Sequence, residues 1–308
     1  LLVPEGQPVP RGLDEDVSIL QEPLQNIYLV ASGVMDMFAS LDAVDQIRFS
    51  GQKQENWYIQ TAKDAMEAGD MIYAGKYSKP DYELLVSEGC DLAIENRMIT
   101  HSPEVVEMLQ SFDIPVMIEY SSYEKHPLGK VEWVKFFGAL TGKEAEAEEA
   151  FAEQTEILEE VESGEKTGKT IAFFYVTSNG LIQVRQSTDY IPKLIELAGG
   201  RYIFEDLEDS GSGRSTLNMP VEDFYAGAKD ADILIYNSSI DGGVTTVDEL
   251  IGKCNILKDF KAVQEGQVYC TTNDMYQQSM AIGYLLQDMH TVLTDDDTAK
   301  LRYLFLLQ

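Results

Sequence analysis

The sequence contains few residues whose types and spacing match those of known catalytic motifs. It has no G-x-S-x-G nucleophile elbow, no GxxxxGK phosphate loop and no G-x-G-x-x-G after a predicted strand. The GSG at 211–213 lies in a polar stretch, and we interpret it as a flexible connection. His101, His126 and His290 lack the converging ligands of a zinc site. We therefore expect a binding protein that has no catalytic residues and no dedicated metal site.

Cys90, Cys254 and Cys270 bear on the alternative of metallocluster chemistry. An enzyme with twin α/β domains around a metal cluster relies on cysteines that converge at loops. Here Cys90 precedes a predicted strand, Cys254 lies in a predicted helix, and Cys270 lies near a strand end. Buried structural thiols are the simpler interpretation, and the cluster enzyme stays the less favoured alternative.

The residues best suited to chemistry are binding groups at the ends of predicted strands. Tyrosine and tryptophan rings can pack on a planar or bulky ligand, and a tyrosine hydroxyl can bind its edge. Arginine and lysine, which are scarce in this chain, can bind carboxylate, hydroxamate or catecholate groups. The predicted ligand-binding residues are Ser32, Trp57, Tyr58, Lys76, Tyr77, Asn96, Arg97, Met98, Ser121 and Ser122 in the first half, and Ser178, Asn179, Arg185, Arg214, Ser215, Tyr236, Asn237, Asn273 and Tyr276 in the second.

An alternation of strand and helix patterns positions these loops. After a proline-punctuated, extended segment 1–25, the predicted strands of the first half are NIYLVAS, IRFSG, MIYAG, CDLAIE and IPVMIEY, separated by helices, and Ser102 is the predicted cap of SPEVVEMLQSFD. In the second half KTIAFFYVTS, DADILIYNSS and QVYCTT alternate with helices. The pattern predicts an α/β fold with two Rossmann-like lobes, each containing a central, mostly parallel sheet. Ligands bind beyond the carboxyl ends of such strands, so the loops are expected to form one cleft between the lobes.

One continuous helix pattern, over residues 144–164, separates the two halves. Ala147, Phe151, Leu158 and Val161 recur on one face, and glutamates fill much of the remainder. A helix of this length spans roughly 30 Å. The predicted organisation is therefore an N-terminal lobe over 1–142, an interlobe helix over 143–165 and a C-terminal lobe over 166–308.

Composition excludes some classes of partner. The net charge of -30 over 308 residues repels nucleic acid and anionic lipid surfaces. No apolar run reaches the roughly 18 residues of a membrane helix, and LLVPEGQPVP lacks the features of a signal peptide. These observations predict either a cytoplasmic protein or an exported protein whose targeting segment has been removed.

Several longer sequence segments resemble segments of the periplasmic-binding-protein family for iron siderophores, haem and vitamin B12. AGKYSKPDYELLVSEGCDLAI is similar to the first-lobe signature, and IPVMIEYSSYEKHPLGKVEWVKFFGALTGKEAEAEEAF to the next strand, crossing segment and interlobe helix. DYIPKLIELAGGRYIFED and VEDFYAGAKDADILIY are similar to segments of the second lobe. The resemblance covers most of residues 26–290. GCDLAI departs from the usual strand pattern of the family. The segment RSTLNMP, which precedes Glu222 in this chain, contains no tryptophan, whereas some corrinoid binders have one in the matching loop.

This resemblance implies the substrate-binding subunit of an ABC importer, which captures an iron complex, either a siderophore or haem, and delivers it to a permease dimer. It implies a location outside the cytoplasmic membrane, as a lipoprotein or a periplasmic protein, and permease docking through Glu104 and Glu222. We expect a monomer with no cofactor of its own. Met98, His101 or a tyrosine could contact haem iron. A corrinoid-binding protein, with or without a transporter, stays open as an alternative.

Overall fold

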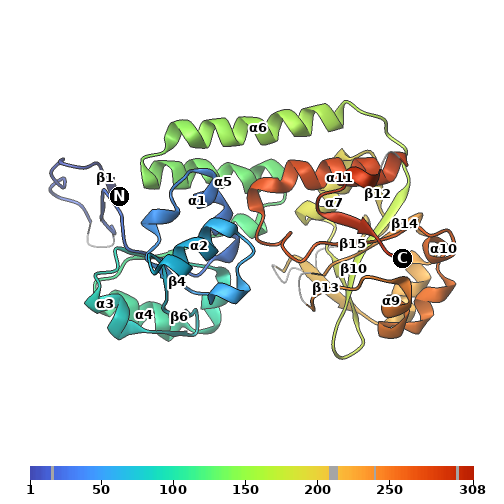
Figure 1. Ribbon diagram of the computed structural model, residues 1–308, viewed down its shortest axis with the longest axis horizontal. Helices are drawn as coiled ribbons and strands as arrows, with labels where there is room; N and C mark the ends of the chain where they lie inside the picture. The colour runs from blue at the N-terminus through green and yellow to red at the C-terminus, as the bar shows by residue number, and fades with distance from the viewer. Residues whose placement is uncertain (15–16, 208–213, 239–240, 296–297) are drawn as a thin grey trace. The chain divides into compact units, whose positions relative to one another are not determined.

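The computed structural model describes residues 1–14, 17–207, 214–238, 241–295 and 298–308, so the GSG at 211–213 lies outside the described residues. The chain divides into two compact units (Figure 1). Unit 1 contains Leu1–Ser122, Glu132–Ala152 and Gln277–Met280, and unit 2 contains Tyr123–Val131, Glu153–Tyr276 and Ala281–Gln308. The α/β fold class is confirmed. The domain boundaries inferred from the sequence stay a prediction, and they did not anticipate the assignment of 123–131 and 277–280.

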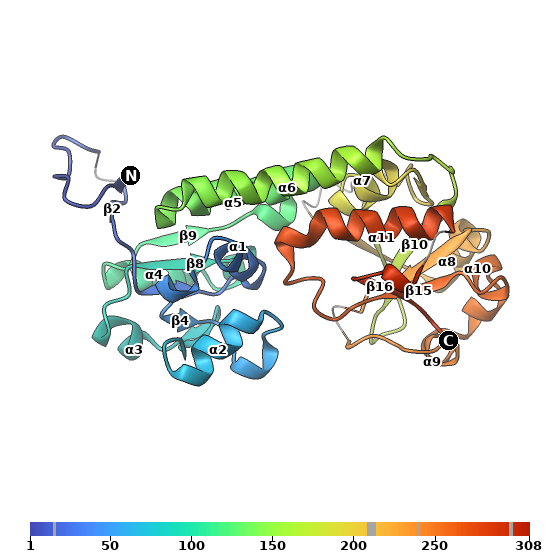
Figure 2. The ribbon, with the colours of Figure 1, turned by 45° about the horizontal axis from the view of Figure 1, so that its top comes forward.

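Unit 1 is built on a five-stranded sheet whose pairings are all parallel. The strand order is β5 (Ile72–Tyr73), β4 (Phe49–Ser50), β3 (Ile27–Leu29), β8 (Leu92–Glu95) and β9 (Val116–Ile118). Figure 2 labels β4, β8 and β9 within this unit. Every residue of β3 and β8 is buried, as expected for central strands of a parallel sheet covered on both faces. The strands predicted for the first half are confirmed.

Helices of unit 1 bury apolar residues against this sheet. α3 (Tyr82–Ser87) and α4 (Pro103–Ser111) pack Leu85, Val105 and Leu109 in one cluster with Tyr28 and Phe49. The other helices of this unit include α1 (Met35–Ser40) and α2 (Gln60–Ala68). Ser102 occupies the N-cap position of α4, as predicted, but its side chain makes no capping hydrogen bond. Pro103 occupies the first turn, where its fixed φ favours helix initiation.

Two small sheets complete unit 1. β1 (Leu2–Val3) pairs in parallel with β2 (Leu20–Gln21) within the segment that the sequence predicts to be extended. β6 (Gly75–Lys76) and β7 (Lys79–Pro80) form an antiparallel hairpin after β5.

Residues Gln277–Met280 belong to unit 1 through specific hydrogen bonds. The buried Gln277 side chain accepts from Tyr58 N at 2.7 Å and donates to Asn56 O at 2.8 Å. Met280 N donates to Asp36 Oδ2 at 2.7 Å. A late part of the chain is therefore fixed to residues more than 200 positions earlier.

α5 (Pro127–Thr141) and α6 (Glu144–Glu162) are consecutive helices. α6 is continuous over 19 residues and confirms the helix predicted over 144–164, although it ends at Glu162. Within unit 1 the two helices approach closely, since a Cβ at Gly138 would lie 2.5 Å from the Ala147 Cβ. Within the described residues no helix combines the length and the apolar composition needed to span a bilayer.

The sheet of unit 2 has parallel central strands and antiparallel edges. β10 (Thr170–Val176), β14 (Ile233–Tyr236) and β15 (Val268–Thr271) pair in parallel, and β12 (Arg201–Tyr202) pairs in parallel with the start of β10. β11 (Ile182–Arg185), β13 (Thr216–Met219) and β16 (Leu304–Leu306) are antiparallel additions that the sequence analysis did not predict. Gly180, at φ +80°, lies in the turn that reverses the chain between β10 and β11.

Helices also pack on the unit 2 sheet. α8 (Val221–Ala228), α9 (Val247–Lys253) and α10 (Lys261–Gln264) share an apolar cluster with β10, β14 and β15. α7 (Tyr190–Leu197) and α11 (Ile282–Thr294) bury most of their apolar residues. Asp288 of α11 accepts hydrogen bonds from the backbone N–H of Arg302, Tyr303 and Leu304, and so holds β16 in place.

Replacement of Gly199 by alanine should destabilise unit 2. Gly199, just after α7, has φ +92°, and a Cβ there would lie 2.6 Å from Glu165 O. Left-handed strain and a backbone clash together should lower the free energy of unfolding by about 2 kcal/mol. Urea denaturation followed by far-UV circular dichroism measures this loss. Gly252→Ala in α9 is the control, because its Cβ would have no atom within 4 Å; equal stability of the two variants would contradict the expectation.

Candidate functional site

The carboxyl ends of β3 and β8 form the switch point of the unit 1 sheet. From β3 the chain continues to β4 and β5 on one side, and β8 and β9 follow on the other side. Ligands of open α/β sheets bind at such a point. Val30 N and Ala31 N donate to Ile94 O at 2.9 and 3.3 Å, so the chain leaves β3 directly beside the end of β8. The loops after β3 and β8 are therefore the first candidates for a ligand site in this unit.

Predicted binding residues of unit 1 lie at this edge. Ser32 begins the 3-10 helix η1 (Ser32–Val34) after β3, Asn96 follows β8, and Ser121 and Ser122 follow β9. Asn96 Oδ1 accepts from Met98 N at 2.8 Å and caps the 3-10 helix η4 (Arg97–His101). The sequence prediction thus named residues that the fold brings to one edge of the sheet.

The η4 helix presents a sulfur and an imidazole to solvent. The Met98 side chain is 48% exposed, and His101 is also exposed. Residues three apart on a 3-10 helix lie one above the other. This arrangement makes Met98 and His101 neighbours on one side of η4, adjacent to Arg97.

Buried glutamates mark the ends of β8 and β9, and their hydrogen bonding differs. Glu119 Oε2 accepts from Ser121 N at 2.9 Å and from Ser121 Oγ at 2.6 Å, so Glu119 positions the Ser121 loop. Glu95 is 0% exposed, and within the described residues neither of its carboxyl oxygens has a hydrogen-bond partner. A charged carboxylate in that position would have no compensating donor.

Burial raises the pKa of Glu95 to about 8, so its carboxyl group is mostly neutral near pH 7. The groups that face it are tyrosines. The pKa of Tyr28 on β3 is raised by burial and then by the Glu95 charge. The pKa of Tyr82 on α3 is raised by burial, then by Glu104 and Glu95. The carboxyl that precedes the Asn96 loop therefore titrates in an environment of apolar and phenolic groups.

Trp57 requires a correction. Its side chain is 0% exposed, and its indole Nε1 donates to Ser50 Oγ at 3.0 Å. Trp57 is thus a core residue of unit 1, and the prediction that it contacts ligand is wrong. The next residue, Tyr58, is 44% exposed, while Lys76 and Tyr77 lie in the β6–β7 hairpin beyond β5.

In unit 2 the corresponding switch point lies between β10 and β14, because β12 pairs on one side of β10 and β14 on the other. Asn237 directly follows β14, and its N–H donates to Phe174 O at 2.8 Å. Asn273 follows β15, and its side chain lies near the Gly243 backbone. Ser178 and Asn179 form the exposed turn between β10 and β11. These residues lie at the carboxyl ends of the parallel strands, as predicted.

Tyr236, by contrast, is fully buried and serves its own loop. Its hydroxyl donates to Asp241 Oδ2 at 2.7 Å, and Lys253 Nζ approaches the same oxygen at 2.6 Å. Hydrogen bonds from Lys253 and Tyr236 hold the pKa of Asp241 below its usual value despite partial burial. The prediction that Tyr236 contacts ligand is therefore wrong; the residue holds the chain that follows Asn237.

Arg185 also requires a correction. It ends β11, an antiparallel strand, so it lies beside the middle of β10 and not at the carboxyl ends of the parallel strands. Its guanidinium pairs with the buried Asp189 at 3.5 Å and lies over the Phe173 ring. Arg185 therefore has a structural role as the ion-pair partner of Asp189, and the prediction that it contacts ligand is wrong. Arg214 and Ser215 precede β13, and their carbonyls accept from Gln186.

Three further predicted residues are accessible. Glu104 lies in the first turn of α4 and Glu222 in the first turn of α8, and both side chains are exposed. Tyr276, between β15 and α11, is 38% exposed.

Metal-ligating residues are dispersed over the described part of the chain. It contains no group of three or more His, Cys, Asp or Glu placed to hold a metal ion. Cys90 is half-buried in unit 1, while Cys254 and Cys270 are buried in unit 2, and none forms a disulfide. Burial raises the pKa of Cys270 to about 11, so that thiol stays protonated.

The sequence analysis missed three acids at the strand ends, namely the buried Glu95 and Glu119 and the exposed Asp241. One signal was available for Glu95. It ends the apolar strand LAIE, and a carboxyl group in a strand covered on both faces must be paired or neutral.

Comparisons with known proteins identify a family by one family model and a shared fold by solved structures. A family model described as periplasmic binding protein matches residues 29–275. The chain is 25% identical over 311 residues to a lipoprotein of Methanocaldococcus jannaschii, an alignment that covers 95% of this chain and 72% of that protein. The periplasmic haem-binding protein of Vibrio cholerae has a similar structure, with a TM-score of 0.69, 15% identity, and coverage of 88% of this chain and 99% of its own.

A structure of the ABC-type Fe3+-hydroxamate transport system from Saccharomonospora viridis is also similar. Its TM-score is 0.65, with 17% identity over 88% of this chain and 93% of that chain. At such identities the likeness shows the shared fold.

Glu95 should make the stability of unit 1 fall as the pH rises. Its pKa is about 8 in the folded chain and near the ordinary 4.5 in the unfolded chain, so the folded state retains a proton that the unfolded state loses. The stabilisation is complete below about pH 4.5 and is lost towards pH 8, with about 2 kcal/mol lost between about pH 6 and pH 8. Both tryptophans, Trp57 and Trp133, lie in unit 1, so fluorescence-detected urea denaturation reports on this unit.

Glu95→Gln should remove this pH dependence, and Glu95→Leu, which also removes the unpaired polar atoms, provides a second test. Glu119→Gln is the matched control, because Glu119 is buried at the adjacent strand and is hydrogen-bonded. It should keep the wild-type slope. A slope that Glu95→Gln leaves unchanged would show that Glu95 is not the titrating group.

Proposed function

The chain belongs to the periplasmic binding protein family, and from this premise we propose that it is the substrate-binding subunit of an ABC importer. Its cargo is an iron complex, a siderophore or haem, which it delivers to a permease at the membrane. The observation that carries the proposal is the family match over residues 29–275, which includes the strand-end loops of both units. Proteins of this family bind and release their ligands, so the protein is a binding protein and not an enzyme.

The chemistry of the η4 segment supports an iron complex as the cargo. Arg97 supplies a permanent positive charge that suits the propionates of haem or the anionic groups of a siderophore. Met98 and His101, which are exposed on the same 3-10 helix, are residue types that ligate haem iron. Two similar structures belong to a haem-binding protein and to an Fe3+-hydroxamate transport system, which is consistent with either cargo.

The proposed location is outside the cytoplasmic membrane. One relative is a lipoprotein, and the family is described as periplasmic. The proposed permease contacts are Glu104 on unit 1 and Glu222 on unit 2, since each is exposed in the first turn of its helix and can approach arginines of a partner.

Direct titration of the purified full chain tests the cargo. Haem binding is followed by its absorption band, and a ferric trihydroxamate, a ferric catecholate and cobalamin are titrated by calorimetry. We expect submicromolar affinity for haem or for one ferric siderophore. Arg97→Ala should weaken that affinity about tenfold, because it removes a charge-assisted contact. Arg11→Ala is the control, since Arg11 lies in the exposed N-terminal segment.

If cobalamin is the only ligand that binds tightly, the cargo is a corrinoid and the proposal of an iron complex is wrong. Absence of binding to any of these ligands would contradict the proposed cargo. If Arg97→Ala leaves the ligand affinity unchanged, Arg97 does not contact the ligand.

Charge reversal at Glu104 and Glu222 tests the proposed docking. The variants Glu104→Lys and Glu222→Lys should bind ligand as the wild type does, while uptake by cells that carry the transporter falls at least tenfold, about 1.4 kcal/mol in effective affinity. Glu156→Lys is the control, because Glu156 is an exposed glutamate of α6 that has no proposed contact. Undiminished uptake with both reversals would exclude these residues as docking contacts.

A further inference from the structure

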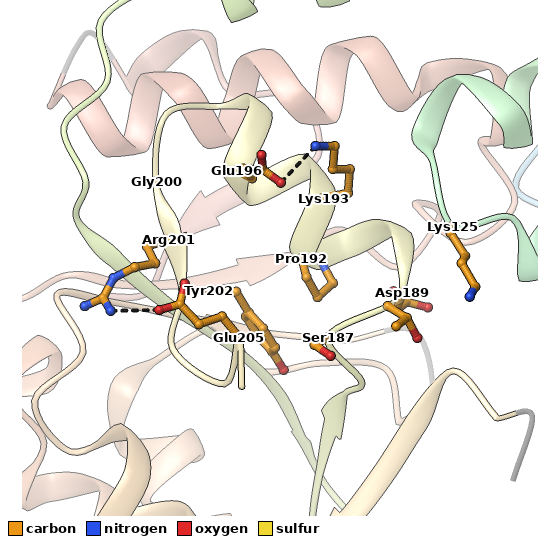
Figure 3. A pocket seen from close by; sticks show the side chains of 11 residues that line it. Lys125, Ser187, Asp189, Pro192, Lys193, Glu196, Gly200, Arg201, Tyr202 and Glu205 are labelled. Carbon is orange, nitrogen blue, oxygen red and sulfur yellow. Dashed lines mark hydrogen bonds and ion pairs between the residues drawn. The ribbon is translucent and has the colours of Figure 1, made fainter. Parts of the chain in front are cut away.

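Unit 2 contains a pocket of about 400 Å3 beside α7, which we call the α7 pocket (Figure 3). It is lined by loop 187–189, by α7, by the segment 200–205 that includes β12, and by Lys125. All of these belong to unit 2. The volume falls within the range of small-molecule sites.

The α7 pocket is separate from the strand-end loops of unit 2. Tyr202 of β12 pairs with Ile171, near the amino end of β10. β11 runs antiparallel to β10, so Ser187, which follows β11, also lies towards that end. Asn179 and Asn237 lie at the carboxyl ends of β10 and β14. The pocket and the residues Asn179 and Asn237 therefore lie towards opposite ends of the same strands.

Hydrogen bonds hold the walls of the α7 pocket in place. The Tyr202 hydroxyl donates to Arg185 O at 2.8 Å, and Ser187 Oγ donates to Leu207 O at 2.8 Å. Asp189 Oδ1 accepts from Ile191 N at 3.0 Å and caps α7. A ligand would therefore meet a preformed surface and would lose little free energy to ordering it.

One cation at the pocket has no ion pair among the residues that the structure describes. The three carboxylates that line it each have their own cation, since Asp189 pairs with Arg185 at 3.5 Å, Glu196 with Lys193 at 2.9 Å and Glu205 with Arg201 at 3.0 Å. Lys125 forms no ion pair with any residue that the structure describes. When Arg185 is counted as the partner of Asp189, the charged groups at the pocket are four cations and three carboxylates, in a chain of net charge -30.

An apolar floor lies between these charged groups. Figure 3 shows the Pro192 and Tyr202 side chains in the centre, with the Lys193–Glu196 and Arg201–Glu205 pairs to two sides and Lys125 near Asp189 on a third. Pro192 and Tyr202 both line the pocket, and both are largely buried. The exposed Thr188 adds a hydroxyl to the lining of the pocket.

We propose that the α7 pocket binds a small organic monocarboxylate that has a compact apolar body. One uncompensated lysine matches one negative charge, whereas a phosphate monoester would bring about two. The carboxylate contacts Lys125 and the Thr188 hydroxyl, and the hydrocarbon or aromatic part packs on Pro192 and Tyr202. The proposal for this pocket does not depend on the proposed import function or on which cargo binds at the strand-end loops.

Four probes separate charge from shape in a nuclear magnetic resonance titration of the full chain. Benzoate has both the carboxylate and the ring, while benzamide has the ring without the charge. Acetate has the single negative charge without a ring, and inorganic phosphate carries more than one negative charge and has no ring. Benzoate should shift the amide signals of Thr188 and Gly200 with at least fivefold tighter binding than the other three probes, because only benzoate uses both features of the pocket.

Lys125→Met should weaken benzoate binding about fivefold to tenfold, while Lys258→Met, another exposed lysine of unit 2, should leave it unchanged. Because Lys125 is exposed and forms no ion pair within the described part of the chain, its replacement should not disturb folding. The proposal is overturned if benzamide or phosphate binds as well as benzoate, if the two lysine variants behave alike, or if benzoate shifts no signal at the pocket. It is likewise overturned if the shifted signals belong to the strand-end loops.

Discussion

The parallel pairing of β3 with β8 is the constraint on which the arrangement of unit 1 depends. Parallel strands that run side by side must release the chain at the same edge of the sheet. Ser32 and Asn96 therefore both lie at this edge, although the paired residues Leu29 and Ile94 are 65 positions apart in the sequence. The hydrogen bonds from Val30 and Ala31 to Ile94 O continue this pairing beyond the regular strand. The position of every other loop at this edge follows from the order in which β4, β5 and β9 add to the two central strands.

Polar groups at strand ends are handled in two ways, which have different physical consequences. Glu119 satisfies its charge locally through Ser121, and a carboxylate bonded in this way shapes a loop. Glu95 enters the apolar side of the sheet and stays neutral through proton binding. In unit 2, Asp241 resembles Glu119, because its carboxylate accepts hydrogen bonds from Tyr236 and Lys253. The loops after β9 and β14 are thus each fixed in part by a single carboxyl group.

The regular elements could be predicted because burial on both faces produces apolar runs and amphipathic repeats. β10 and α6 are long, and their periodicity is clear. Antiparallel β11, β13 and β16 escaped prediction because they are short and pair with distant partners, such as Ile182 with Met219. Side-chain direction was the weakest inference. Trp57 and Tyr236 have amphipathic rings that suit a ligand or a core equally, and their hydrogen bonds to Ser50 and Asp241, invisible in the sequence, place both inside.

The anchoring of Gln277 and Met280 on unit 1 means that the units are not consecutive modules. The chain enters unit 2 at Tyr123, returns to unit 1 at Glu132, leaves again at Glu153 and returns once more for Gln277–Met280 before α11. No single cut would separate two complete halves, and a gene fragment encoding either half alone would omit pieces of its core. Exchange of one half between relatives, in evolution or in the laboratory, would therefore require several coordinated crossovers.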